Sequence, residues 1–443
     1  MIYDFIEIDY DSDISLYIQL YQQLKAAIDN SLIEVETKLP SIRVAANELK
    51  LSRTTIENAY NRLCSEMYLE NRPQKGFFVK KPIIKTYKQL ANNEKEILYD
   101  FSSSQIDVLA ADIPIWNKYI RNILKHEKTL ATYGEPQGEL SLREAISTYV
   151  YTTRSVISTS DNIIIGAGVQ QLISLLCCIM PKAKVAIDYP GFKHAEQIFK
   201  DYGFETIFIN DPKHPEINLD NVKADIYYYI PSLKAKMSAS LIHENRQSLI
   251  KWLNASDKHY IIEDDFNGEL KFKSKAIASL QSLNNQRIIY LGSFSKLLLP
   301  SVRIAYGIFP NDLLAKYQKI KTYYNQTASK VEQLALAEYI HDGYLEKHLR
   351  RLKKLYLAKS NELIRIIEKE FPNAKIQLLE SSLSIIFELD TNLDEESLKE
   401  LLINNGIAIE GLDNNKLKLN FAGIQIDKME EAIKLISYIT KKR

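Results

Sequence analysis

Short apolar runs rich in isoleucine, valine and tyrosine recur between residues 162 and 293, and they constrain the fold of this chain most strongly. They read NIIIGAG, KVAIDYP, DIYYYIP, HYIIEDD and RIIYLGS. Each is followed by a stretch with helical spacing, which is typical of an α/β domain with a largely parallel sheet. We therefore expect residues 98–443 to form a mostly parallel α/β domain.

The last hundred residues have a different pattern. Residues 345–370 form a long basic amphipathic stretch, and two apolar runs, LSIIFEL and KLKLNF, precede a final helical segment. This order predicts a smaller α+β lobe over residues 344–443.

The first 81 residues carry the pattern of a separate small domain. Apolar spacing predicts helices over about 14–30, 41–49 and 53–67, with Pro40 and Ser52 as start signals of the second and third. Two short strands, about 68–72 and 77–81, flank the turn PQKG. Three helices with a tight second turn and a hairpin predict a winged helix-turn-helix over residues 1–81. Residues 82–97 are the expected linker.

Such a domain predicts double-stranded operator DNA as a partner, because its third helix enters the major groove. An arginine at a helix start is disfavoured by the helix dipole, which favours a DNA contact for Arg53 over an ordinary exposed position. The expected base-reading positions are Arg53, Thr54, Thr55 and Asn58, and Ser52, the expected N-cap, is a further DNA-binding position. The expected phosphate and wing-tip positions are Ser41, Arg43, Lys75 and Gly76.

Basic residues also follow the third helix. Residues 72–88 hold six and no acidic residue: Arg72, Lys75, Lys80, Lys81, Lys85 and Lys88. Taken alone, the run is typical of a solvated linker, but its place on the wing favours a strip that contacts phosphates. Because the net charge is only +1 and residues 1–36 are acidic, we expect DNA binding to be local and salt-sensitive.

Composition narrows the remaining classes. No apolar run approaches the roughly 20 residues of a membrane span, so no membrane partner is expected. The acidic N-terminus lacks the basic region of a signal peptide, and the three cysteines form no metal spacing and no plausible disulfide set. The seven histidines are scattered without ligand spacing. We expect a cytoplasmic protein with free thiols and no structural metal.

Features of the second domain fit one anionic ligand. The turn of Gly166, Ala167 and Gly168 leads into a helix whose first N–H groups, on Val169 and Gln170, would face an anion. Residues IIEDDF end a strand with carboxylates, where α/β sheets bind ligands. The run GSFSKLLLPSVR adds Arg303, the hydroxyls of Ser293 and Ser295, and Lys296. That lysine is either a solvated side chain on a loop or an amine that forms an imine.

The order of these motifs resembles the fold-type I enzymes that depend on pyridoxal 5′-phosphate (PLP), and the N-terminal unit resembles the GntR winged helix. Their combination resembles the MocR subfamily of transcriptional regulators, in its PdxR-like or GabR-like branches. The likeness covers nearly the whole chain. It is carried by KLPSIRVAANELKLSRTTIENAYNRL, TYGEPQGELSLREAI, NIIIGAGVQQ, DYPGF, IIEDDFNGEL and YLGSFSKLLLPSVRIAYG.

The resemblance implies a role for each matching residue. Lys296 would be the Schiff-base lysine, Asp264 would pair with the pyridine nitrogen, and Phe192 would stack on the ring. The phosphate would be held by Val169, Gln170, Ser293 and Arg303. Tyr133 would reach the phosphate of a neighbouring subunit, since such sites form at a dimer interface. The implied partner is therefore a second copy in a head-to-tail, domain-swapped homodimer.

The sequence departs from the family where the ring oxygen and the substrate are bound. Leu233 stands in place of a histidine and Phe266 in place of a tyrosine. Unless Lys234 compensates, the ring oxygen loses donors that each contribute about 1.5–3 kcal/mol. Lys418 replaces the arginine that clamps a substrate carboxylate, and a lysine lacks the planar two-point grip. His194 stands where some relatives place a second such arginine.

These departures favour a regulator with a degenerate substrate site over an enzyme. We expect a dimeric transcription factor whose effector is PLP itself or an amino-acid or amine compound that reacts with it. By resemblance, its targets would lie in vitamin B6 or amino-acid metabolism. One alternative is a catalytically active aminotransferase with a DNA-binding appendage. Another is a regulator that has lost PLP and keeps the domain as a dimerisation scaffold.

Overall fold

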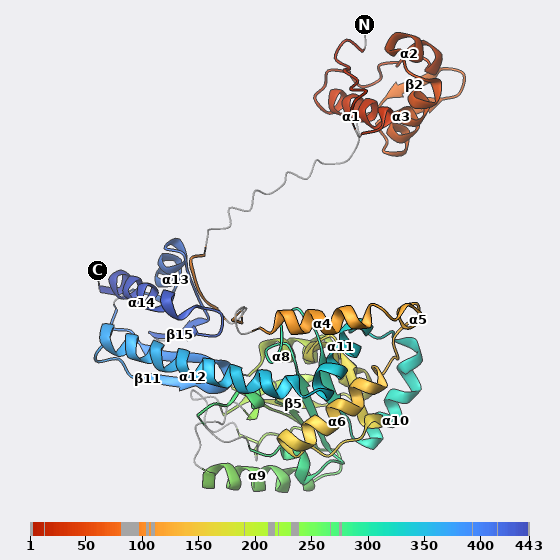
Figure 1. The fold of residues 1–443 in the computed structure, drawn as a ribbon. Coiled ribbons are helices and arrows are strands. Elements are labelled where there is room, and N and C mark those ends of the chain that lie inside the picture. Colours follow the sequence, from red (N-terminus) through yellow and green to blue (C-terminus); the bar gives the residue numbers. More distant parts are fainter. Residues whose placement is uncertain are drawn as a thin grey trace. The chain divides into compact units, whose positions relative to one another are not determined.

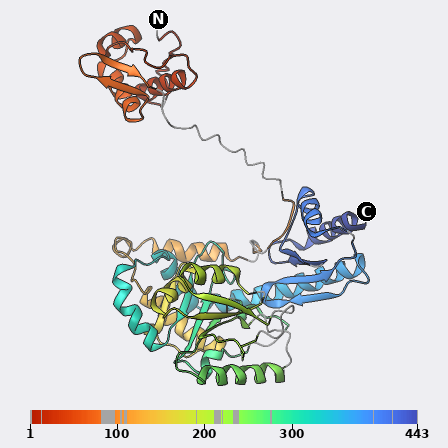
Figure 2. The ribbon, with the colours of Figure 1, turned by 180° about the vertical axis from the view of Figure 1, so that it is seen from behind.

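The computed structural model describes residues 3–12, 14–80, 97–102, 106–107, 111–189, 191–210, 218–219, 221–231, 239–265, 267–273, 277–391, 393–413 and 415–441. The chain divides into two compact units, Met1–Glu94 and Lys95–Arg443, which Figures 1 and 2 show from opposite sides. Among the described residues, no helix is long and apolar enough to cross a membrane.

The N-terminal unit is a three-helix domain with a hairpin. Its helices are α1 (Leu16–Asp29), α2 (Ile42–Leu49) and α3 (Arg53–Ser65), and its antiparallel strands are β1 (Leu69–Arg72) and β2 (Gly76–Val79). The turn between α2 and α3 is tight because Lys50 takes a left-handed conformation, φ 57°. The predicted helices and strands are all present.

An N-terminal arm, residues 3–12, packs onto this domain. Tyr3 is buried, and its hydroxyl contacts the hydroxyl of Tyr60 on α3. The side-chain amide of Gln19 donates to the carbonyls of Asp9 and Ile14 at 2.8 and 2.7 Å. The folded unit therefore begins before residue 14, where the helical pattern of the sequence starts.

A seven-stranded sheet forms the large lobe of the second unit, in the order β4-β10-β9-β8-β7-β5-β6. Only β10 runs antiparallel to its neighbours within the sheet, and the other pairings are parallel, as the sequence predicts. The strands are β4 (Ile163–Gly166), β5 (Lys184–Asp188), β6 (Glu205–Ile209), β7 (Ile226–Tyr229), β8 (Tyr260–Asp264), β9 (Ile288–Ser293) and β10 (Ala305–Ile308).

Helices cover both faces of this sheet (Figure 1). Successive strand residues point to opposite faces, so Ile262 packs in one core with α7, α8 and α10, whereas Ile261 packs in another with α9. Tyr290 lies on the same face as Ile261. It belongs to a third hydrophobic cluster, in which α4, α6 and α11 cover another part of the face that α9 covers. The bounds are α4 (Ile113–Ile123), α5 (Glu127–Leu130), α6 (Leu140–Arg154), α7 (Val169–Ile179), α8 (Lys193–Asp201), α9 (Ala239–Asn254), α10 (Asn311–Ile320) and α11 (Lys330–His341).

The small lobe is built on a four-stranded antiparallel sheet, in the order β11-β12-β15-β14. The sequence predicts β12 and β15 but misses β11 and β14, whose short runs IQLL and GLD lack alternation. The elements are α12 (Tyr344–Glu370), β11 (Ile376–Leu379), β12 (Ser384–Glu388), α13 (Glu395–Asn404), β13 (Ile407–Ile409), β14 (Gly411–Asp413), β15 (Lys416–Asn420) and α14 (Ile426–Lys441).

One strand of this lobe comes from far away in the sequence. Strand β3 (Tyr99–Phe101) pairs in parallel with β13, with Tyr99 opposite Ile407. The backbone N–H groups of Leu98 and Tyr99 also donate to the carbonyl of Gly406, at 2.8 and 3.0 Å. The small lobe therefore includes the first described residues of the second unit as well as residues 344–443.

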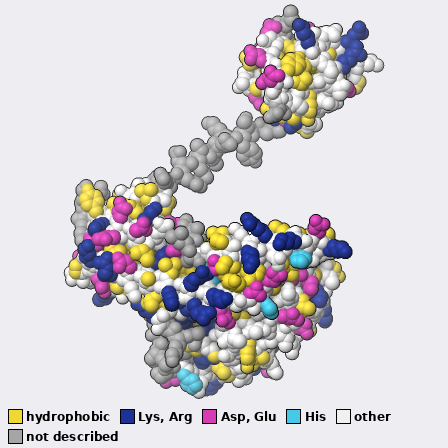
Figure 3. All heavy atoms as spheres, viewed as in Figure 1, with side chains coloured by type: hydrophobic (Ala, Val, Ile, Leu, Met, Phe, Trp, Pro, Cys, Tyr) yellow, Lys and Arg dark blue, Asp and Glu magenta, His cyan; other side chains and the backbone are white. Residues whose placement is uncertain are grey.

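Helix α12 carries a buried cation and an exposed basic stripe. The Lys359 ammonium lies 2.6 Å from Oδ2 of Asp107, and it donates to the carbonyls of Ala422 and Ile424 at 2.9 and 2.6 Å. Figure 3 shows basic side chains along the outer surface at α12. The stripe comprises Lys347, Arg350, Arg351, Lys353 and Lys354.

Candidate functional site

A glycine turn forms one wall of the site. Strand β4 ends at Gly166, and α7 begins at Val169 after its N-cap residue Gly168, whose φ is 106°. An L side chain rarely adopts this φ, so the turn requires glycine. The N–H groups of Val169 and Gln170 lie in the first helical turn, which has no intrahelical acceptor for them. This helix start can therefore hold an anion.

The segment after β9 forms the facing wall. Ser293 ends β9, and the Ser295 N–H donates to its hydroxyl at 3.3 Å. Nη1 of Arg303 donates to the hydroxyl of Ser295 at 3.3 Å. A Cβ placed on Gly168 would lie 2.7 Å from Nη2 of the same arginine. The fold thus brings two serines and an arginine close to a helix start that precedes them by more than 120 residues in the sequence.

Lys296 belongs to the same segment as the facing wall. It follows Ser293 by three residues in the turn between β9 and β10, and it is partly buried. Burial lowers the pKa of the Lys296 ammonium, Glu410 opposes this shift, and Lys418 adds to it. A lowered pKa increases the fraction of neutral amine, which is the form that attacks a carbonyl carbon.

Asp264 ends the neighbouring strand β8 and is 2% exposed. The hydroxyl of Tyr228, on β7, donates to its Oδ2. Burial, and then the adjacent Asp264, raises the pKa of Tyr228 well above its ordinary value, so this hydroxyl stays protonated and acts as a donor. The role of Tyr228 is not visible in the sequence, where it is one of three consecutive tyrosines in DIYYYIP.

The other two carboxylates of the motif IIEDDF, Glu263 and Asp265, form hydrogen bonds with neighbouring segments of the large lobe. Oδ2 of Asp265 accepts from Nε of Arg154 at 2.6 Å and from the Tyr290 hydroxyl at 2.9 Å. Glu263 accepts from the backbone N–H groups of Leu280 and Gln281 at 2.9 and 3.0 Å. Because strand side chains alternate, these carboxylates lie on the opposite face from Asp264. The structure thus separates Asp264 from Glu263 and Asp265, and the pairing of Asp264 with a pyridine nitrogen stays a prediction.

Phe192 and Tyr133 are the two aromatic residues predicted for the site. Phe192 precedes α8 and is partly buried, and its ring centroid lies 5.1 Å from that of His194. Tyr133 is 93% exposed in the single chain, and its carbonyl accepts from Lys330 at 3.5 Å. The role of Tyr133 toward a neighbouring subunit stays a prediction.

Lys418 is already paired within the small lobe. Its ammonium lies 2.9 Å from Oε1 of Glu410, whose backbone N–H donates to the carbonyl of Lys418 at 3.1 Å. The pairing of Glu410 with Lys418 is not visible in the sequence, because nothing in the run GIAIEGLD marks this glutamate as a partner. The other departures from the family, Leu233, Lys234 and Phe266, lie outside the described residues.

The predicted DNA-reading positions line one part of the N-terminal unit. Arg53, Thr54 and Asn58 are exposed on α3. The Ser52 hydroxyl caps this helix start by accepting from the Thr55 N–H at 3.0 Å, and it lies 2.8 Å from the Thr55 hydroxyl. Ser41 caps α2 in the same way, by accepting from Val44 at 3.4 Å. Capping fixes the direction in which α3 presents its first turns.

The basic residues of the wing differ in their internal pairing. Arg72 pairs with Glu36 and Glu70 at 2.8 Å each, and Lys80 pairs with Glu70 at 3.0 Å. Lys75 is exposed in the turn before Gly76. Within the described part of the chain, ion pairs are recorded for neither Lys75 nor two exposed arginines, Arg43 and Arg53. Lys81, Lys85 and Lys88 of the predicted basic strip lie outside the described residues, and the contact of this strip with phosphates stays a prediction.

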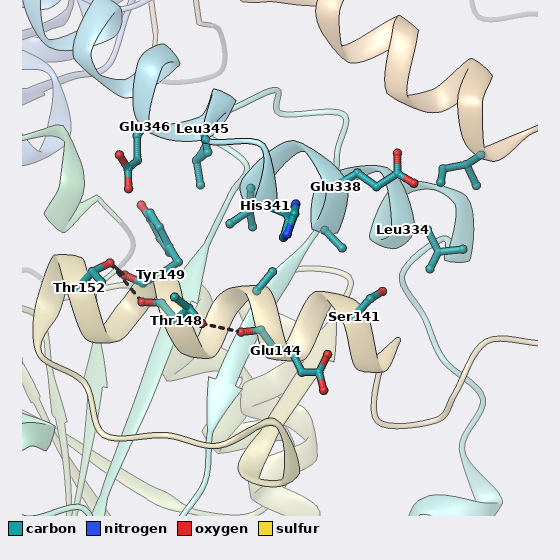
Figure 4. A pocket seen from close by; sticks show the side chains of 15 residues that line it. Ser141, Glu144, Thr148, Tyr149, Thr152, Leu334, Glu338, His341, Leu345 and Glu346 are labelled. Atoms are coloured by element: carbon teal, nitrogen blue, oxygen red, sulfur yellow. Dashed lines mark hydrogen bonds between the residues drawn. The ribbon is translucent and has the colours of Figure 1, made fainter.

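A separate cleft of about 630 Å³ opens between α6, α11 and the start of α12 (Figure 4). Apolar Leu334 and Leu345 line it together with the carboxylates of Glu144, Glu338 and Glu346. None of its lining residues belongs to the Lys296 site. The arrangement of Lys296, Asp264 and the anion cradle is therefore independent of this cleft.

Comparison with known families assigns both units. Residues 96–436 match the class I and II aminotransferases, and residues 16–79 match the gntR family of bacterial regulatory proteins. Solved structures agree on the fold. An archaeal alanine:glyoxylate aminotransferase superposes with a TM-score of 0.68 at 23% identity, covering 79% of this chain and 91% of that one. Kynurenine aminotransferase of Pyrococcus horikoshii superposes with a TM-score of 0.66 at 24% identity, covering 78% of this chain and 91% of that one.

Relatives that contain both units share nearly the whole length. The HTH-type transcriptional regulator YdeL of Bacillus subtilis (strain 168) is 32% identical, covering 95% of this chain and 96% of that protein. The probable rhizopine catabolism regulatory protein MocR of Rhizobium meliloti is 23% identical over 96% and 94%. The pyridoxine biosynthesis regulator PdxR of Corynebacterium glutamicum is 25% identical over 93% and 90%. The chain belongs to the MocR subfamily of GntR-type transcriptional regulators.

Proposed function

We propose that this chain is a cytoplasmic, PLP-responsive transcription factor that binds operator DNA as a homodimer. The observation that carries the proposal is the convergence of Ser293, Arg303 and the start of α7 beside the partly buried amine of Lys296. An anion cradle next to a lysine of lowered pKa suits a ligand that is both a phosphate and an aldehyde. PLP has both groups.

The residues present fit this group at each of its ends. The glycine turn leaves the space that a Cβ would fill, and Val169, Gln170, Ser293 and Arg303 supply donors for a phosphate. Asp264 would hold the proton of the pyridine nitrogen, while the hydrogen bond from Tyr228 stabilises the charged carboxylate. When bound, PLP supplies an aldehyde carbon for an amine and a ring that withdraws electrons. Phe192 would cover one face of that ring, and Tyr133 would reach the phosphate from a second subunit.

The small lobe favours sensing over catalysis. A transaminase must hold its substrate while protons move, and the planar grip of an arginine serves this purpose. Here Lys418 takes that place and is engaged by Glu410. The departures from the family at the ring oxygen and at Lys418 leave the proposed phosphate and pyridine contacts intact. We infer that the site binds PLP, or an amino compound that joins it, without useful turnover.

The relatives suggest where the regulator acts. One is named for rhizopine catabolism and another for pyridoxine biosynthesis. We infer that this chain controls genes of vitamin B6, amino-acid or amine metabolism, with PLP or a reactive amine as its signal.

Absorbance of the purified full-length protein with and without PLP tests the cofactor site. We expect a visible band that PLP restores in the wild type and that Lys296→Ala abolishes. Lys271→Ala is the matched control, because Lys271 is another partly buried lysine whose pKa burial lowers. A band that survives in Lys296→Ala, or no band in the wild type, contradicts PLP binding at this lysine.

Incubation of the PLP-loaded protein with a panel of amino acids tests the absence of turnover. Repeated cycles that yield pyridoxamine phosphate and keto acid would establish an aminotransferase instead. Gel-shift titration of the promoter DNA next to the gene, with and without PLP, tests regulation directly. We expect binding of a symmetric site with an affinity that PLP changes.

A further inference from the structure

The basic stripe of α12 concentrates positive charge on one face of a helix (Figure 3). Its exposed members recur at intervals of three and four residues, which places them side by side over about 10 Å: Lys347, Arg350, Arg351 and Lys354. The partly buried Lys353 adjoins them. The stripe lines an open hollow of about 480 Å³ between α12 and the start of α4.

Most of this charge is not neutralised by neighbouring carboxylates. Arg351 pairs with Asp112, the N-cap residue of α4. Among the described residues, no salt bridge to a carboxylate is formed by the other four members: Lys347, Arg350, Lys353 and Lys354. The stripe therefore presents a net positive surface, although the whole chain has a net charge of only +1.

The later turns of the same helix differ in this respect. Arg365 pairs with Glu362 at 2.6 Å, and Lys369 pairs with Glu430 at 3.1 Å. Like charges three and four residues apart destabilise a helix, whereas opposite charges at these spacings stabilise it. The first turns of α12 thus carry a repulsion that carboxylates relieve further along the helix. A bound polyanion would relieve it as well.

The surroundings of the stripe favour one kind of polyanion. Protein interfaces are poor in lysine and have an apolar centre, which this lysine-rich face lacks. A basic helix that lies on a membrane inserts its apolar face, but here that face is buried in the core through Leu345, Leu349 and Leu352. A second copy could not place its own stripe against this one, because like charges would meet.

Duplex DNA fits both the charge and the setting. It carries one negative charge per about 1.7 Å of its axis, so about 10 Å of duplex offers several phosphates to the stripe. The gntR unit of the same chain binds DNA, so a second contact with that duplex forms within one complex, at a high effective concentration.

We propose that the basic stripe of α12 is a second DNA contact, which binds the phosphate backbone of the duplex that flanks the operator. This contact adds affinity and salt dependence, and it reads no base sequence. The proposal rests on operator binding by the N-terminal unit and is independent of PLP at Lys296.

Two duplexes test the proposal with the full-length protein, once footprinting has mapped the operator. One contains the operator alone, and the other extends it on both sides by about two helical turns. Fluorescence anisotropy at several salt concentrations gives both affinities. We expect the longer duplex to bind about fivefold more tightly at low salt, with a slope of log affinity against log salt that is steeper by about two or more.

A matched pair of double variants assigns this gain to the stripe. Arg350→Gln/Lys354→Gln should reduce the gain to about twofold or less and leave binding of the short duplex unchanged. Arg365→Gln/Lys369→Gln is the control, because it removes the same residue types at the same spacing from exposed positions of the same helix. It should keep the gain. Thermal unfolding checks that both variants fold, and Lys347→Gln/Lys354→Gln replaces the first variant if it does not.

The outcomes separate the two levels of inference. A wild-type protein that does not bind the short duplex contradicts operator binding, and this inference with it. Equal affinity for the two duplexes, a gain that the stripe variant keeps, or an equal loss in both double variants contradicts the inference alone. A stripe variant that keeps the gain but loses its effect on transcription in a purified system would assign the stripe to a protein partner instead.

Discussion

The guanidinium of Arg303 lies directly against the backbone of Gly168, so closely that a Cβ on Gly168 would come within 2.7 Å of Nη2. The two residues belong to the segment before β10 and the turn after β4, and these strands are neighbours in the sheet. Because α7 begins at the next residue, the cation and the helix start point at the same space. A glycine is therefore required both by its φ of 106° and by the arginine that packs on it.

Gly168→Ala should weaken PLP binding by about tenfold or more, since the new methyl group pushes the guanidinium out of the phosphate position. Titration of the visible band measures the effect. Gly203→Ala is the control, because Gly203 also has a positive φ, 77°, but nothing lies within 4 Å of its Cβ position. Both variants carry a backbone cost of about 1–2 kcal/mol, so equal losses of PLP affinity would refute the proposed cradle.

Arg53→Ala should abolish specific operator binding and leave the PLP band unchanged, because the side chain is exposed on the first turn of α3 in the N-terminal unit. Gel shift and absorbance are measured on the same preparation. Arg62→Ala on the same helix serves as the control, since Arg62 packs on Tyr21 and pairs with Glu66. Intact specific binding by Arg53→Ala would overturn the assignment of α3 as the reading helix.

Lys75→Ala should weaken binding to all DNA sequences and reduce the slope of log affinity against log salt by about one. Lys80→Ala should change the slope much less, because Lys80 pairs with Glu70 at 3.0 Å. Fluorescence anisotropy at several salt concentrations measures both slopes. If the two variants lose equal slope, the internal ion pair does not keep Lys80 from the phosphates.

Glu269 should make the stability of the second unit depend on pH. Burial, and then Asp265, raises the pKa of this carboxyl from 4.5 to about 7. The folded state therefore holds the proton more tightly than the unfolded chain, and the free energy of unfolding falls as the pH rises from about 4.5 to about 7. Above that range the contribution is constant.

Glu269→Gln should remove about 1–3 kcal/mol of this pH-dependent loss, because the amide stays neutral throughout. Urea unfolding of wild type and variant at several values between pH 5 and pH 8 provides the comparison. A variant whose stability falls as steeply as that of the wild type would show that another group is responsible.

Lys359→Met should destabilise the protein by about 3–5 kcal/mol, because it leaves the Asp107 carboxylate buried beside an apolar side chain. Adding Asp107→Leu should recover part of the loss. Lys369→Met is the control, since its ion pair with Glu430 is exposed, and we expect a change within about 1 kcal/mol. Urea unfolding measures all three, and equal losses for the two lysines would contradict the inferred cost of the buried charge.

The sequence predicts the fold class, the helices of the N-terminal unit and the sheet, because the spacing of apolar residues within each segment indicates a helix or a strand. It also predicts Lys296, Ser293 and Arg303 as neighbours, since they follow one another within eleven residues. Their approach to Gly168 is consistent with the family resemblance and is visible only once β4 and β10 pair.

The missed features depend on contacts between distant segments. Glu410 and Lys418 meet because β14 and β15 pair antiparallel, and β14 has only three residues and no recognisable pattern. Arg72 and Lys80 read as part of a basic run until the fold brings Glu36 and Glu70 beside them. A sequence gives the number of charged residues in a run. The charge that a surface presents also depends on which of those residues form ion pairs in the fold.

Strand β3 ties the first described residues of the second unit to the small lobe. Residues 99–101 pair with β13. Glu410 directly follows β13, and β14 begins at the next residue. The DNA-binding unit is therefore attached, through the residues that precede β3, to the lobe that carries Glu410 and Lys418. The position of β3, the first described strand after residue 96, is therefore set by the same lobe that holds β14 and β15.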